Sequence, residues 1–131
     1  MLALFVMAFL DPCAAEERKS GVEERQCFAV LADQTDREMA AQWRLALNKA
    51  KREDVIARRE KANRPLMVVN LLASQRAWLR YREAQCAMIS DQAAGGTGYG
   101  EMDSRCRIDL NRRRTADLKR RAGGFLAPPF P

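Results

Sequence analysis

Two cysteines on opposite sides of a glycine-rich stretch constrain this chain more than any other feature. Cys86 lies near the end of one segment with helical spacing, and Cys106 lies near the start of the next. The stretch between them contains GGTGYG at positions 95–100, a composition typical of a turn. In an antiparallel helical hairpin the two cysteines would lie opposite each other, within reach of a disulfide. The pattern therefore predicts two helices tied together at one end.

Helical periodicity defines these two segments and one before them. Side chains recur three or four residues apart along residues 66–90 and residues 102–122, and a similar stripe runs through residues 22–51. The inward positions are Leu71, Leu72, Gln75, Trp78, Leu79, Arg82, Cys86 and Ile89 in the middle segment, Met102, Cys106, Leu110, Arg114 and Leu118 in the last, and Asp36, Met39, Trp43 and Leu47 in the first. No segment has the alternation of a strand. The sequence predicts an all-α fold, a small antiparallel helical bundle stabilised by disulfides.

Several boundaries can be predicted from local chemistry. Thr35 and Glu38 match a capping box, so the first helix is expected to restart there. Residues 51–63 are rich in charge and predict a solvated helix or a helical crossover, and Pro65 suits the first turn of the next helix. Gly123 suits a helix C′ position, and prolines prevent the helix from continuing. We expect one domain over residues 13–122 and a flexible tail over 123–131.

The N-terminal residues resemble part of an export signal. Residues 1–10 form a continuous apolar run, too short to span a bilayer as a helix. Its length suits the apolar region of a secretory signal, although the basic region that normally precedes it is missing. Residues 1–12 are therefore predicted to be a truncated signal peptide, and the alternative is a buried N-terminal helix. Export predicts a periplasmic or secreted protein.

Four cysteines agree with an oxidising compartment. Cys13, Cys27, Cys86 and Cys106 allow three disulfide pairings, and the sequence does not choose among them. We favour Cys86–Cys106 with Cys13–Cys27, because an up-down-up bundle brings these positions to one end. Loss of Cys13 with a signal peptide would leave Cys27 unpaired. The alternative is four reduced, buried cysteines in a cytosolic protein.

The residue types exclude most catalytic chemistry. The chain has no histidine, which removes the commonest general base, the Ser-His and Cys-His pairs and imidazole-ligated zinc. No two cysteines have CxxC spacing, and no pair of carboxylates is set apart as an acid and a base. We predict a non-enzymatic protein with no cofactor and no metal site.

Polar residues on the inward faces predict a structural contact. A buried arginine requires an acceptor, so Arg82 and Arg114 need partners. Asp36 is the expected partner of one of them and Gln75 completes the set, giving a polar clamp between three helices. The alternative function is an anion site. Trp43 and Trp78 are expected to lie in the core around this clamp.

The charge balance indicates what kind of partner is compatible. The chain carries 23 basic and 17 acidic residues, a net charge of +6. A basic protein favours anionic partners, although a solvated basic face explains the same composition. Basic clusters at residues 112–114 and 119–121 suit a helix C-terminus. Nucleic acid is not an expected partner, because exposed aromatic residues are not interleaved with the basic ones.

The helical hairpin resembles a known family. The segment Gln75-Arg76-Ala77-Trp78-Leu79-x-Tyr81-Arg82-x-x-x-Cys86, the glycine-rich turn, and Cys106-x-x-x-Leu110-x-x-x-Arg114-Thr115-x-x-Leu118 resemble the lysozyme inhibitor LprI-like N-terminal domain. The spacing of Cys13 and Cys27 and the Asp36, Met39 and Trp43 pattern resemble its first helix. Ala40, Trp43 and Asn111 depart from the residues usual in that family. The resemblance covers about residues 13–119.

The resemblance implies an all-helical, exported, disulfide-bonded protein that binds and inhibits a lysozyme. The expected binding loop is the exposed turn, with Gly95, Gly96, Thr97 and Tyr99 as its candidate residues. The net positive charge argues against this function, because animal lysozymes are also strongly basic. The alternative is an envelope structural domain that binds anionic wall or membrane components through basic helix faces.

Overall fold

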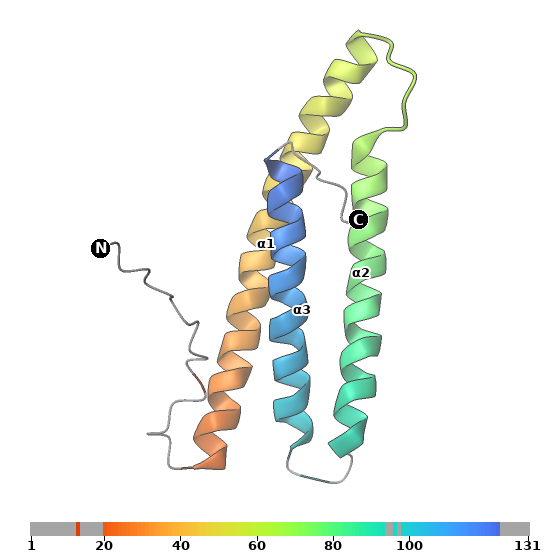
Figure 1. Cartoon of the computed structure of the whole chain (residues 1–131). Helices are drawn as coiled ribbons and strands as arrows, with labels where there is room; N and C mark the ends of the chain where they lie inside the picture. The colour runs from red at the N-terminus through yellow and green to blue at the C-terminus, as the bar shows by residue number, and fades with distance from the viewer. Residues whose placement is uncertain (1–12, 14–19, 94–95, 97, 124–131) are drawn as a thin grey trace, which may run out of the picture.

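Three helices make up the bundle. The computed structural model describes residue 13, residues 20–93, residue 96 and residues 98–123. α1 (Gly21–Arg59), α2 (Met67–Ser90) and α3 (Tyr99–Ala122) run up, down and up, with the short 3-10 helix η1 (Asp91–Ala93) following α2 (Figure 1). The described part of the chain contains no strand. The predicted all-α bundle with disulfides is confirmed, and the predictions for residues 1–12 and 124–131 lie outside the described residues.

α1 is one continuous helix of 39 residues, so the predicted restart at Thr35 is wrong. The Thr35 hydroxyl donates to the Ala32 carbonyl at 3.0 Å, one turn back within the helix, and makes no cap. The true N-cap is Ser20, whose side-chain oxygen accepts from the backbone N–H of Glu23 at 3.2 Å. Of the two alternatives for residues 51–63, the solvated helix is correct as far as Arg59.

α2 is capped by a side chain from α1. Leu66 stands at its N-cap position and supplies no side-chain acceptor. The Asp54 carboxylate instead accepts from the backbone N–H groups of Met67 at 2.7 Å and Val68 at 3.0 Å. Burial by itself would raise the pKa of Asp54, but these two bonds and the nearby Arg64 lower it. Asp54 thus fixes where α2 begins against α1.

Three predicted boundaries differ from the structure. Pro65 precedes the N-cap of α2 and so lies outside its first turn. α3 begins at Tyr99, three residues before the predicted start. Gly123 is right-handed, with φ of −73°, and its N–H donates to the Lys119 carbonyl at 2.9 Å. It therefore closes the last turn without the left-handed geometry that favours glycine.

The core follows the inner face of α1. Its buried alanines let α3 pack closely along the length of α1. Apolar residues then fill three successive clusters between the helices. These are Phe28, Ala32 and Ile108 near Cys13; Leu110 beside Cys86 and Cys106, with Trp78 and Ile89 against them; and Met39, Ala46, Ala50, Leu71 and Leu118, with Trp43 and Leu47 against them.

Candidate functional site

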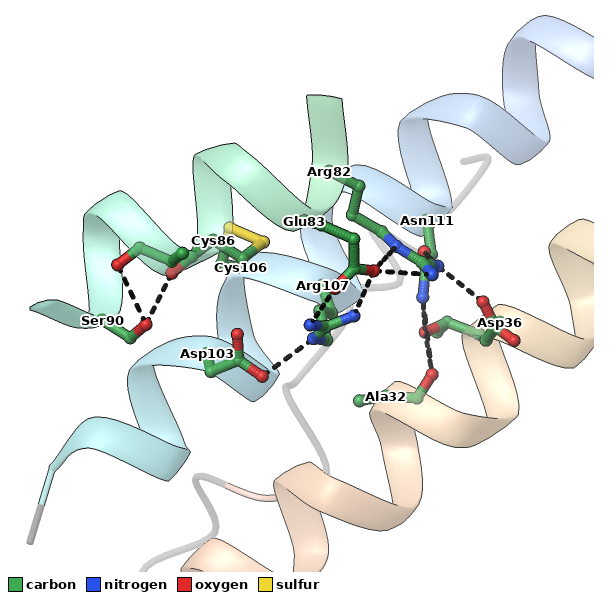
Figure 2. Close-up of polar contacts among 12 residues, drawn as sticks. Ala32, Asp36, Arg82, Glu83, Cys86, Ser90, Asp103, Cys106, Arg107 and Asn111 are labelled. Atoms are coloured by element: carbon green, nitrogen blue, oxygen red, sulfur yellow. Dashed lines mark hydrogen bonds and ion pairs between the residues drawn. A yellow bond between two sulfur atoms is a disulfide. The ribbon is translucent and has the colours of Figure 1, made fainter. Parts of the chain in front are cut away.

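Both disulfides lie at the end of the bundle where α1 begins. Cys86 and Cys106 join α2 to α3, and Cys13 and Cys27 join the preceding chain to α1; each pair has Cα atoms 5.5 Å apart. No cysteine among the described residues is free. Beside the first bridge, the buried Ser90 hydroxyl donates to the Cys86 carbonyl at 2.7 Å (Figure 2). The Cys86–Cys106 disulfide thus joins α2 to α3, and the Ser90 bond lies within the last turn of α2.

One arginine connects all three helices (Figure 2). Arg82 Nη1 on α2 lies 2.5 Å from Asp36 Oδ1 on α1 and 2.8 Å from Asn111 Oδ1 on α3. The Asn111 amide then donates to Thr35 Oγ1 at 3.1 Å. The Arg82 side chain is 11% exposed, whereas that of Asp36 is 50% exposed, so one side of this contact reaches solvent. Of the two arginines for which Asp36 was a candidate partner, Arg82 is therefore the one in contact with it.

A second group of ion pairs extends from the Arg82 contact toward the Cys86–Cys106 disulfide. Glu83 accepts two bonds from Arg107, at 2.8 and 2.6 Å, in the paired geometry that suits a guanidinium. Arg107 also donates from Nε to Asp103 at 2.8 Å. Hydrogen bonding by Arg107 lowers the pKa of Glu83 more than burial raises it. The same carboxylate raises the pKa of Arg107.

The other predicted members form a separate contact. Arg114 donates to Gln75 at 3.0 Å and to Ser74 at 2.9 Å, and it does not reach Asp36. Its guanidinium lies 5.9 Å from the centre of the Trp78 ring, and that of Arg82 lies 5.4 Å from the same ring. Burial lowers the pKa of Arg114, which nevertheless remains a cation. The predicted set is thus divided into two contacts on either side of Trp78.

Trp43 packs against the upper cluster as a partly buried residue. Its indole Nε1 is the one buried side-chain polar atom of the described residues that has no hydrogen-bond partner. Of the two tryptophans, Trp78 is the one whose ring both arginines approach.

Sequence reasoning missed Asn111, Glu83, Arg107 and Asp54. Asn111 directly follows Leu110, which lies on the inward stripe of the last helix. A buried polar side chain needs a hydrogen-bond partner, so the position of Asn111 could have marked it as a contact residue. Glu83 and Arg107 lie beside the stripe on separate helices. Nothing in either segment alone indicates that they meet.

The predicted binding loop is only partly described. Gly96 donates its N–H to the Ala93 carbonyl at 2.9 Å, and Tyr99 is 45% exposed at the start of α3. Gly95 and Thr97 lie outside the described residues. No group of three metal-ligating side chains occurs in residues 13, 20–93, 96 and 98–123. The described part of the turn thus offers exposed side chains between two helices that a disulfide joins.

Charge is strongly polarised along the bundle. At the disulfide end, residues 20–40, 79–93 and 98–110 carry ten acidic and six basic side chains, a net charge of −4. At the opposite end, residues 41–78 and 111–123 carry four acidic and fifteen basic side chains, a net charge of +11. The division falls close to the level of the Arg82–Asp36 contact. The positive balance of the chain therefore belongs to one end only.

These features define the class of small, disulfide-bonded helical proteins. In this chain both disulfides lie at the acidic end of the bundle. A family model described as "Lysozyme inhibitor LprI" matches residues 13–118, which include α1, α2, most of α3 and all four cysteines. The chain belongs to this lysozyme inhibitor LprI family. No helix in the described ranges is long and apolar enough to cross a membrane.

A curated relative matches only part of the chain. An uncharacterised protein from Rhizobium meliloti is 43% identical over 49 residues, which is 37% of this chain and 35% of the relative. The chain thus aligns with about a third of the length of that relative. No solved protein structure is significantly similar to the chain.

Proposed function

We propose that this protein acts outside the reducing cytosol as a non-enzymatic inhibitor that binds a lysozyme with its acidic, disulfide-bonded end. Membership of the LprI family supports the partner, and two disulfides support an oxidising compartment. The observation that carries the proposal is the net charge of −4 at this end.

Polarised charge removes the electrostatic objection to a basic lysozyme. A basic enzyme approaching the molecule would be attracted to the disulfide end and repelled from the opposite end. Asp91 and Tyr99 are exposed where the α2–α3 connection begins and ends, on helices that Cys86 and Cys106 hold together. A rigid, preorganised loop support lowers the entropy lost on binding.

A muramidase inhibition assay tests this function. The double variant Asp91→Lys/Tyr99→Ala is expected to inhibit a basic lysozyme about tenfold or more weakly than the wild type, because it loses an aromatic contact and reverses a charge. Glu60→Lys makes the same charge change at the exposed opposite end and should inhibit normally. Raising the salt concentration should weaken wild-type inhibition. Failure to inhibit lysozymes of every structural type would refute the proposal.

The alternative is an envelope domain that binds anionic wall or membrane components through its basic helix faces. The fifteen basic residues of the opposite end are the only observation in its favour. The comparisons name no such partner. Salt-sensitive binding to lipopolysaccharide or peptidoglycan, without lysozyme inhibition, would favour this alternative.

A further inference from the structure

Two hollows lie along the seam between α1 and α2. The lower has a volume of about 400 Å³ and the upper about 350 Å³, and no α3 residue lines either of them. We call this seam the α1–α2 groove; its apolar lining comes from Ala40, Trp43, Leu72 and Leu79 in the lower hollow and Val55 and Val69 in the upper. The groove therefore lies on the side of the bundle that α3 does not cover.

The apolar side chains of the groove are unusually exposed for a packed helical pair. Val69 is 62% exposed, Val55 45% and Leu79 36%. Single exposed apolar residues are ordinary on a protein surface. Val55 and Val69 line the upper hollow, and Leu79 lines the lower one with Trp43. Concave apolar surfaces of this kind gain free energy when another apolar surface covers them.

A row of basic residues recurs along α1, and its last two members line the upper hollow of the groove. Arg37, Arg44, Lys51 and Arg58 recur at every seventh position and all four are exposed. At 1.5 Å per residue, neighbours are about 10 Å apart and the row is about 30 Å long. Lys51 and Arg58 line the upper hollow, whereas Arg37 and Arg44 do not line the lower one. We call these four residues the basic row.

No residue of the basic row forms an ion pair, although other basic side chains of the described chain do. Arg82, Arg107 and Arg121, for example, each bind a carboxylate. Across the groove on α2, Arg76 is also exposed and also forms no ion pair. Asp36 lines the lower hollow beside Arg76 and Arg82, and Asp54 lines the upper one beside Lys51 and Arg58, so basic side chains outnumber acidic ones in each hollow. Such a surface complements an anionic partner.

The seven-residue period identifies the shape of that partner. Two helices packed at a small crossing angle meet along apolar positions that repeat every seven residues, and charged residues beside these positions pair across the contact. We propose that the α1–α2 groove binds an acidic amphipathic α-helix of another protein. Its apolar stripe fills the two hollows, and its carboxylates pair with the basic row. Binding makes a fourth helix of the bundle. This inference does not depend on lysozyme inhibition.

Synthetic helical peptides of about three heptads provide the probe. The first has leucine at the core positions and glutamate beside them, and the second has lysine in place of each glutamate. Fluorescence anisotropy of the labelled peptides should show that the wild-type protein binds the glutamate peptide and does not bind the lysine peptide. The variant Arg44→Glu/Lys51→Glu/Arg58→Glu should bind the glutamate peptide about tenfold or more weakly and should now bind the lysine peptide.

The matched control is Arg52→Glu/Arg59→Glu/Lys119→Glu. It makes the same change in net charge at exposed residues that form no ion pair and do not line the groove, so its peptide preference should stay that of the wild type. Equal loss of binding in both triple variants would overturn the proposal, because net charge alone would then explain it. Binding to anionic phospholipid vesicles through the basic row, with no binding of the glutamate peptide, would also overturn it.

Discussion

At the scale of single residues, the chemistry of Asn111 explains how three helices meet. Its side-chain oxygen accepts from Arg82 and its amide donates to Thr35, so one buried residue satisfies both neighbours. The need of a buried arginine for an acceptor predicted the partner of Arg82 on α1. Because α1 is continuous, Thr35 is a buried residue inside the helix and not an N-cap. Its hydroxyl oxygen can therefore accept from another helix.

Arg82→Ala is expected to lower the free energy of unfolding by about 1–3 kcal/mol, because it leaves the buried Asn111 oxygen without its donor. Urea denaturation at neutral pH measures this change. Arg80→Ala is the matched control, since Arg80 is exposed on the same helix and forms no ion pair. An Arg82→Ala protein as stable as the wild type would contradict a stabilising role for this contact.

At the scale of elements, the two ends of α2 are held by different means. A disulfide holds its C-terminal end against α3, and the Ser90 hydroxyl bonds to the Cys86 carbonyl in the last turn of α2 itself. Its N-terminal end depends on Asp54, which is 3% exposed and reaches across from α1. Sequence separations of 20 and 14 residues between bridged cysteines correspond to roughly 3 kcal/mol each in the chain-entropy account of disulfides.

Asp54→Ala should loosen the first turn of α2 while the disulfide end stays folded. The backbone N–H groups of Met67 and Val68 lose their acceptor, so their hydrogen exchange should become faster than in the wild type. Exchange around Cys86 should change little. Glu60→Ala removes an exposed carboxylate nearby and serves as the control. Unchanged exchange at Met67 and Val68 would mean that Asp54 does not hold this helix start.

At the scale of the whole molecule, carboxylates with lowered pKa link stability to acid pH. Ion pairs with arginine lower the pKa of Glu53 and Glu83 below the ordinary value of 4.5. A carboxyl group whose pKa is lower when folded stabilises the protein above its unfolded pKa, and this stability is lost as pH falls through the folded pKa. With no histidine, no side chain has an ordinary pKa between pH 5 and 8.

The melting temperature should therefore stay nearly constant from about pH 8 to pH 5 and fall below about pH 4.5. Thermal unfolding followed by circular dichroism across this range measures it. Glu83→Gln should reduce the acid-dependent part of the fall, because its side chain cannot lose a charge. A melting temperature that already declines between pH 7 and 6 would show that other groups control stability.

The sequence by itself determined the helices, their order and the family, and it favoured the disulfide pairing that the structure has. Local spacing contains this information, because helical period, glycine turns and cysteine position act within one segment or between neighbours. It also identified Asp36 as the partner of either Arg82 or Arg114, since a buried cation needs an acceptor wherever it lies. Only the tertiary structure decided that Arg114 joins Gln75, that Asp54 caps α2, and that acidic and basic halves separate. Those outcomes depend on which residues of distant segments reach the same level of the bundle, and no single segment contains that information.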